Sequence, residues 1–174
     1  MARVPYVARE NLPESDRHIY DEIAGKRGRA NAGNNFEALL NSPQAASKVS
    51  DLGAYLRYES ELPGMVRELI ILTVATELNC EYEWAEHESS ARKAGITDAT
   101  IAAIRERRAP QALPPDEANI VRYVHELLRT RHVSDATFKT MLGQLGTKLL
   151  VEATIVVGYY TMLALTFLAL NIEH

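Results

Sequence analysis

The chain has 174 residues, 47% of them hydrophobic and 24% charged, which is enough to form one domain, or a domain with a small appendage, around a substantial core. Its formal net charge of −4 argues against nucleic acid as a partner, because no excess of Lys and Arg is available for phosphate groups. Its single cysteine excludes an intrachain disulfide and a cysteine-rich metal cage.

The N-terminal part, residues 1–35, is predicted to be an arm, a first helix at residues 13–27 and a loop rich in Gly and Asn. The arm has no apolar stretch, so we expect no signal peptide. Together with the single cysteine, this favours a cytoplasmic location. The remaining residues, 36–174, are predicted to form one helical domain.

Apolar residues recur with helical spacing along this domain, and no segment alternates between apolar and polar residues as a half-buried strand would. We therefore predict an all-α fold. The expected helices cover residues 42–61, 67–78, 80–94, 97–108, 115–132, a short helix from residue 134 that closes at Gly143 or Gly146, and residues 149–170.

The last of these segments, Leu149–Leu170, is long enough to span a bilayer and contains a single charge, Glu152. The other helices are amphipathic, however, and need a partner to cover their apolar faces. We therefore interpret Leu149–Leu170 as a central or subunit-interface helix, and we expect no membrane partner.

The stretch Arg67–Gly95 carries the only residues that form a chemical-looking cluster. It opens with Arg67 and Glu68 and is then apolar on almost every side up to the next helix. A helix that is hydrophobic all round is buried, so Glu68 is predicted to be a carboxylate inside the core. Asn79 suits an N-cap, which makes Cys80 the expected first residue of the following helix.

On this following helix Cys80, Glu83 and His87 fall at i, i+3 and i+7, and therefore on one face. A thiol, a carboxylate and an imidazole thus share a stripe beside the helix that carries Glu68. The other histidines have no metal-ligand spacing, and Glu83, Glu86 and His87 are too few to indicate a metal site, so none is predicted.

The pattern resembles the family of carboxymuconolactone decarboxylases and alkylhydroperoxidase D proteins, over residues 36–170. The peroxidase branch has the signature Glu-x11-Cys-x2-Cys-x3-His. Glu68, Cys80, Glu83 and His87 reproduce every spacing, with Glu83 in place of the second Cys. The resemblance implies an alkylhydroperoxidase D-like helical bundle that assembles through its apolar helices into homo-oligomers, as dimers, trimers or hexamers.

The residue at position 83 separates two kinds of chemistry. A reductant-linked peroxidase of this type needs a second thiol to resolve a sulfenic acid into a disulfide, and Glu83 cannot supply one. Glu83 four residues before His87 instead resembles the decarboxylase branch, which needs no thiol. Cys80 leaves open a one-cysteine peroxidase that uses an external thiol.

Decarboxylation of an unsaturated lactone needs no metal or organic cofactor, because the lactone carbonyl accepts the electrons released as CO2 leaves. For this reaction we expect His87 to act as acid or base, Glu83 to orient it, and Glu68 to be a second proton carrier. Arg67 is expected to bind an anionic group of the substrate. Each residue also has a structural interpretation: a surface helix pair for Glu83 and His87, an ion pair for Arg67 and Glu68, and a small buried hydrophobe for Cys80.

Three functions follow from these residues. The favoured one is a cofactor-independent enzyme that decarboxylates, or transfers a proton on, a small carboxylated lactone or related acid. The second is alkylhydroperoxidase activity of the peroxiredoxin type through Cys80. The third is a non-catalytic helical oligomer that binds a small ligand.

Overall fold

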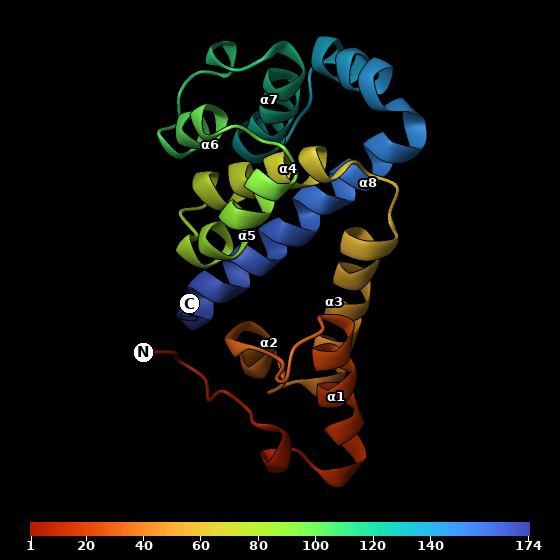
Figure 1. The fold of residues 1–174 in the computed structure, drawn as a ribbon, viewed down its shortest axis with the longest axis vertical. Helices are drawn as coiled ribbons and strands as arrows, with labels where there is room; N and C mark the ends of the chain where they lie inside the picture. Colours follow the sequence, from red (N-terminus) through yellow and green to blue (C-terminus); the bar gives the residue numbers. More distant parts are fainter. The chain divides into compact units, whose positions relative to one another are not determined.

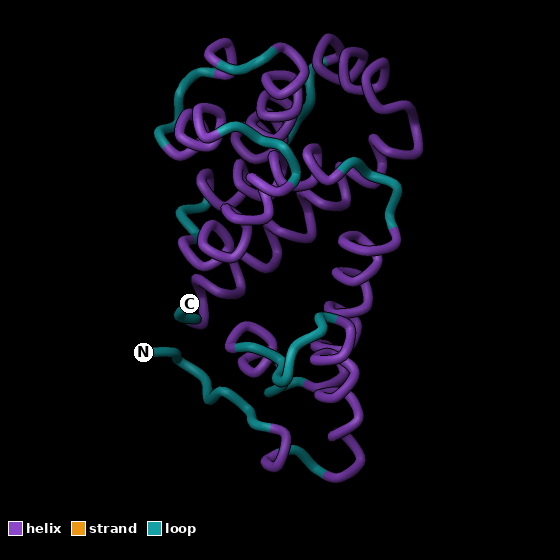
Figure 2. Tube along the Cα trace, in the orientation of Figure 1, coloured by secondary structure: helices purple, strands orange, loops and turns teal.

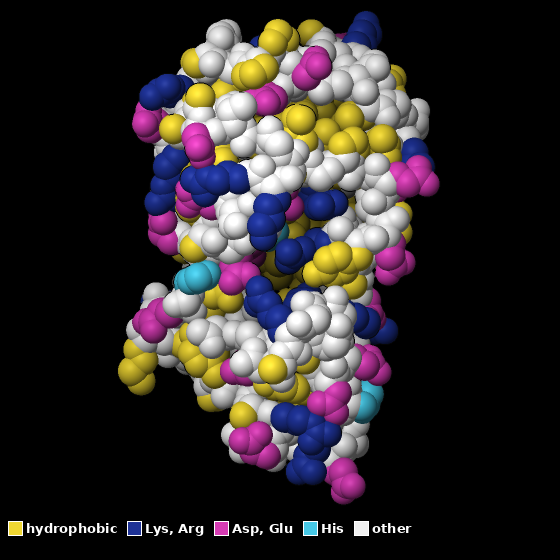
Figure 3. Space-filling model, viewed as in Figure 1, with side chains coloured by type: hydrophobic (Ala, Val, Ile, Leu, Met, Phe, Trp, Pro, Cys, Tyr) yellow, Lys and Arg dark blue, Asp and Glu magenta, His cyan; other side chains and the backbone are white.

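The computed structural model describes all 174 residues and contains helices, turns and loops but no strand (Figures 1 and 2). The predicted all-α fold is confirmed. The chain forms two compact units, one of residues 1–60 and 167–174 and the other of residues 61–166. On the face drawn in Figure 3, acidic and basic side chains are interspersed with hydrophobic ones.

The first unit is built on three helices and three short turns: α1 (Arg17–Lys26), α2 (Asn34–Leu39), α3 (Pro43–Ala54), two 3-10 turns (Arg9–Asn11 and Glu14–Asp16) and a π-helical turn (Tyr55–Glu59). Its core gathers apolar side chains from the arm, the helices and the links between them: Leu12, Ile19, Tyr20, Ile23, Phe36 and Leu40. The backbone N–H of Arg3 donates to the carbonyl of Leu170 over 2.8 Å, so the two ends of the chain lie side by side (Figure 1).

Helix α2 was not predicted from the sequence. It has six residues and follows Gly33, whose φ of 81° is easy for glycine but unfavourable for other residues. A helix of this length shows less than two turns of periodicity, so the apolar pattern does not reveal it.

The second unit is organised around α4 (Gly64–Glu77). Helices α5 (Glu81–Lys93), α6 (Asp98–Arg105) and α7 (Pro115–Thr130) all pack against it, and a 3-10 turn (Pro110–Ala112) links α6 to α7 (Figure 1). The side chains of α4 are buried on every side, including Leu69, Ile70, Ile71, Leu72 and Val74. Burial of one such side chain contributes roughly 1.5–3 kcal/mol, which explains why this helix is central.

The corner between α4 and α5 differs from the prediction by one residue. Asn79 has a left-handed φ of 55°, and Cys80, with φ −93° and ψ 91°, is the N-cap of α5. Two hydrogen bonds close α4, from the Cys80 N–H to the Ala75 carbonyl (2.8 Å) and from the Asn79 N–H to the Thr76 carbonyl (3.2 Å). The end of α4 needs a left-handed residue, which Asn tolerates, so Asn79 ends one helix instead of capping the next.

The long C-terminal helix, α8 (Asp135–Leu170), is two helices joined at Gly146, where φ is 73° and ψ is 170°. The predicted break at a glycine is therefore confirmed. By length and composition α8 could cross a membrane, but one such helix is weak evidence, because the core helix of a soluble protein passes the same test. Residues on one side of the helix are buried, including Leu150, Ala153, Val156, Val157, Tyr160 and Leu163.

Candidate active site

Helices α4 and α5 bring Glu68 and His87 together inside the second unit. Glu68 is 4% exposed and His87 is 2% exposed, and His87 Nδ1 lies 2.8 Å from Glu68 Oε2. A buried carboxylate is costly unless it is hydrogen-bonded or paired, and this contact supplies such a bond. The predicted placement of Glu68 inside the core is confirmed.

Glu83 lies on the other side of the same imidazole. It is also 4% exposed, and its Oε2 is 3.6 Å from His87 Nε2. The pair is therefore not a solvent-exposed helix pair, and the hydrogen bond that orients the ring comes from Glu68, although the sequence had suggested Glu83. An ionised carboxylate only accepts hydrogen bonds, so with Glu68 ionised Nδ1 holds a proton and Nε2 is the nitrogen that can exchange one.

Arg67 stands next to this group at the beginning of α4. Its Nε is 3.5 Å from Glu68 Oε1, and that nitrogen is buried without a hydrogen-bond partner. The side chain is 17% exposed. The guanidinium is partly accessible, and guanidinium groups bind carboxylates.

Cys80 is a free, buried thiol near Glu83. Burial raises the pKa of the Cys80 thiol above its usual value, and the Glu83 carboxylate raises it further. The backbone N–H groups of Glu83 and Tyr82, at the N-terminus of α5, act in the opposite direction but do not overcome these effects. Together these effects favour the neutral thiol over the thiolate.

A family model described as the carboxymuconolactone decarboxylase family matches residues 43–126, which include Arg67, Glu68, Cys80, Glu83 and His87. The matched segment belongs to the carboxymuconolactone decarboxylase family. No curated protein matches the chain. The fold of the chain is similar to that of an alkylhydroperoxidase D core.

Several solved structures share that fold, and two of them serve as examples. One is an alkylhydroperoxidase AhpD core, a peroxidase-related protein from Ralstonia eutropha JMP134, with a TM-score of 0.78 and 15% identity, covering 99% of this chain and 91% of that one. The other is a peroxidase-related protein from Silicibacter sp. TM1040, with a TM-score of 0.77 and 15% identity, covering 98% and 88%. At this identity the likeness shows the fold alone.

Tyr160 belongs to the site but lies outside the segment matched to the carboxymuconolactone decarboxylase family. Its ring meets the His87 ring edge to face, with centroids 5.1 Å apart, and Tyr159 meets Tyr160 in the same way at 5.2 Å. Sequence reasoning did not assign these tyrosines to the site. The available signal was a pair of adjacent tyrosines in a largely aliphatic segment, residues 149–166.

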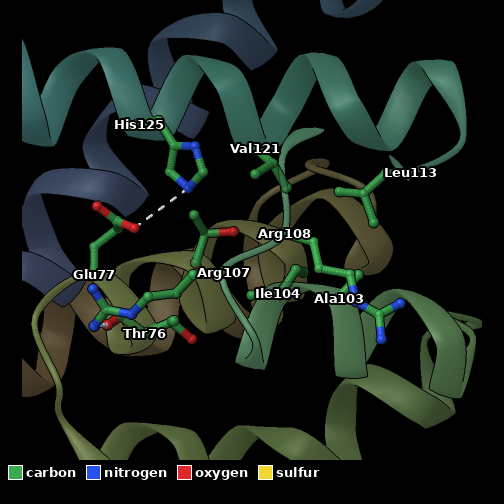
Figure 4. A pocket seen from close by; sticks show the side chains of 10 residues that line it. Thr76, Glu77, Ala103, Ile104, Arg107, Arg108, Leu113, Val121 and His125 are labelled. Carbon is green, nitrogen blue, oxygen red and sulfur yellow. Dashed lines mark hydrogen bonds and ion pairs between the residues drawn. The ribbon is translucent and has the colours of Figure 1, made fainter. Parts of the chain in front are cut away.

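A second histidine–carboxylate group lies at the other end of α4. His125 on α7 points toward Glu77, with Nε2 3.5 Å from Oε1 (Figure 4). Glu77 also accepts two hydrogen bonds from Arg129, of 2.6 and 2.7 Å, which hold the pKa of this carboxyl below its usual value. Burial and the Arg129 charge lower the pKa of His125.

The structure contains no group of three or more His, Cys, Asp or Glu side chains placed to hold a metal ion. Among the predicted site residues, Glu68, Glu83 and His87 form one contiguous group. Arg67 lies at the edge of this group, next to Glu68. Cys80 lies near Glu83, whose charge acts on the thiol. These five side chains define the candidate active site of this carboxymuconolactone decarboxylase family segment.

Proposed function

We propose that the site carries out proton chemistry without a cofactor, decarboxylating or transferring a proton on a small carboxylated lactone or related acid. The observation that carries this proposal is the buried imidazole of His87, which has one carboxylate at each ring nitrogen: Glu68 at 2.8 Å and Glu83 at 3.6 Å. The contact with Glu68 fixes the ring through Nδ1. His87 Nε2 and the Glu83 carboxylate are then two neighbouring groups that can each donate or accept a proton.

In decarboxylation the bond between the ring carbon and the carboxylate breaks, CO2 leaves, and the electron pair moves into the unsaturated lactone carbonyl. Arg67 binds an anionic group of the substrate and holds it for this step. His87 then delivers a proton from Nε2 to the carbon of the resulting dienolate, and Glu83 exchanges the proton with the ring. Glu68 stabilises the imidazolium that forms when His87 is reprotonated.

The test is turnover of a carboxymuconolactone by the purified protein, followed by the loss of its ultraviolet absorbance and the release of CO2. Cys80→Ser is expected to retain the rate, because no step uses the thiol. His87→Ala is expected to lose at least about 100-fold in kcat, whereas His132→Ala, at an exposed histidine, should behave as wild type. Absence of turnover in the wild type contradicts the proposal.

Hydroperoxide reduction at Cys80 is the second candidate. The observation that favours it is the position of Cys80 at the N-terminus of α5, with the N–H groups of Tyr82 and Glu83 acting to lower its pKa. The thiolate would attack the hydroperoxide and break its O–O bond, forming a sulfenic acid and an alcohol. Two equivalents of an external thiol would then regenerate Cys80 and give water and a disulfide. Cys80→Ser would abolish this activity, whereas lactone turnover would remain.

We further propose that the protein is a cytoplasmic homo-oligomer with no membrane partner. Uncharged side chains that point away from the buried side of α8 form an exposed stripe: Val151, Ile155, Met162 and Leu165. Exposed apolar stripes of this kind mark protein interfaces. Ile155→Glu is expected to lower the mass measured by light scattering, and an unchanged mass rejects this interface. If the oligomer forms but neither substrate is turned over, the non-catalytic ligand-binding function remains.

A further inference from the structure

A polar pocket lies outside the catalytic group, at the corner where α4 meets α5. It has a volume of about 100 Å³ and is lined by Ala75, Thr76, Asn79, Glu81, Arg105 and Arg107. One buried water needs only about 10–15 Å³, so this pocket has room for a small ion. Its charged and amide side chains are exposed, which leaves the pocket accessible from solvent.

The charges in this pocket do not cancel. Arg105 pairs with Glu81 over 2.6 Å. Arg107, by contrast, has no carboxylate within ion-pair distance, and its Nη2 donates only to uncharged oxygens, to Asn79 Oδ1 at 2.7 Å and to the Thr76 carbonyl. The neighbouring Arg108 pairs with Glu106, and Arg129 pairs with Glu77. Among the residues that line the pocket, Arg107 is therefore the one guanidinium without a carboxylate ion pair, and the nearest carboxylate charge that it acts on outside the lining is Glu77.

Two further donors in the pocket have no protein partner. Thr76 is 6% exposed, and its Oγ1 is buried without a hydrogen bond. A buried hydroxyl without a partner costs about 1–3 kcal/mol, so an acceptor beside it would be stabilising. Asn79 uses its Oδ1 to accept from Arg107, which leaves its Nδ2 group available as a donor. Figure 4 shows Thr76 beside the Arg107 side chain.

We propose that this pocket binds a small oxyanion, a phosphate or a carboxylate group, between Arg107, Asn79 and Thr76. An oxyanion supplies several acceptor oxygens and the negative charge that this set of donors lacks. Arg107 contributes its free Nε and Nη1 groups while its Nη2 keeps the helix corner closed. The proposal is independent of the catalytic one, because it uses none of the five site residues.

The experiment is a titration of uniformly 15N-labelled protein with inorganic phosphate or acetate, observed by NMR at the Asn79 Nδ2 and Arg107 Nε signals. A control titration uses sodium chloride at matched ionic strength. We expect saturable shifts at these two groups, with a Kd on the order of 1 mM. Saturation by phosphate alone or by acetate alone identifies which oxyanion geometry the pocket takes, and both results support the proposal.

Asn79→Asp is the decisive variant. Aspartate tolerates the left-handed conformation at this position, and the new carboxylate keeps the contact with Arg107, so the corner stays closed. The same carboxylate neutralises the free charge and repels an anion, and binding should weaken at least about tenfold. Arg107→Gln should have the same effect, whereas the matched control Arg108→Gln should bind as wild type. Equal binding by wild type and Asn79→Asp, or shifts that chloride reproduces, overturns the proposal.

Discussion

The two histidine–carboxylate groups of the second unit place similar residues in different surroundings. Both take their Glu from α4, where Glu68 and Glu77 are nine residues apart and therefore lie on opposite faces, about 180° around the helix. The first group meets His87 from α5, and the second meets His125 from α7.

The difference between the groups lies in what surrounds the Glu. Glu77 is neutralised by a bidentate Arg129, and its contact with His125 is long, at 3.5 Å. Glu68 has Arg67 only at 3.5 Å, and its short contact, 2.8 Å, is with the imidazole. A carboxylate held by an arginine fork ties two helices together, whereas a carboxylate held by an imidazole that also faces Glu83 can pass a proton.

The largest effect is expected when each of the two histidines is replaced by alanine in a separate variant. His87→Ala should lower kcat for the lactone at least about 100-fold, while His125→Ala should leave it within about threefold, since His125 lies on the other face of α4. Steady-state kinetics on both variants measures this contrast. Equal losses in the two variants would show that the groups are not functionally distinct.

The next contrast replaces the carboxylates. Glu77→Gln should lower the free energy of unfolding by about 1 kcal/mol, a modest value because Arg129 is half exposed and solvent screens the pair. Glu68→Gln should instead lower kcat at least about tenfold, because the amide cannot stabilise an imidazolium as a carboxylate does. Urea unfolding and kinetics on both variants separate these effects, and a Glu77→Gln protein with impaired kcat but normal stability would reverse the assignment.

The third contrast is a pH dependence of stability. Because the folded-state pKa of His125 is lowered, protonation is less favourable in the folded protein than in the unfolded chain. Stability should therefore fall as the pH drops through about 6.5. The lowered pKa of Glu77 acts in the same direction, but below about pH 4.5. The free energy of unfolding, measured in urea between pH 7.5 and 5.5 for wild type and His125→Gln, isolates the contribution of this histidine. If it falls equally steeply with pH in both proteins, His125 is not the source of the pH dependence.

The smallest effect concerns the reactivity of Cys80. Since burial and Glu83 raise the pKa of the thiol, alkylation by iodoacetamide at pH 7 should be at least about tenfold slower than for free cysteine. The same chain in denaturant should react at the ordinary rate. Fast alkylation of the folded protein would favour the peroxidase function.

The spacing of Glu68, Cys80, Glu83 and His87 was sufficient to predict that these side chains lie near one another, because a helix converts fixed offsets into a shared face. It could not decide which carboxylate holds the ring, since this depends on how α4 and α5 cross. Tyr160 was missed because its contact with His87 joins residues far apart in the sequence. Likewise, the role of Arg107 at the helix corner follows from tertiary packing, which local patterns do not encode.

Decarboxylation of a carboxymuconolactone in D2O by the Cys80→Ser protein tests whether this site moves protons without using the thiol. We expect CO2 release at the wild-type rate and one deuterium at the protonated carbon of the product, found by mass spectrometry and NMR. Loss of turnover on removing the thiol, or hydroperoxide reduction as the only activity of the wild type, would contradict it.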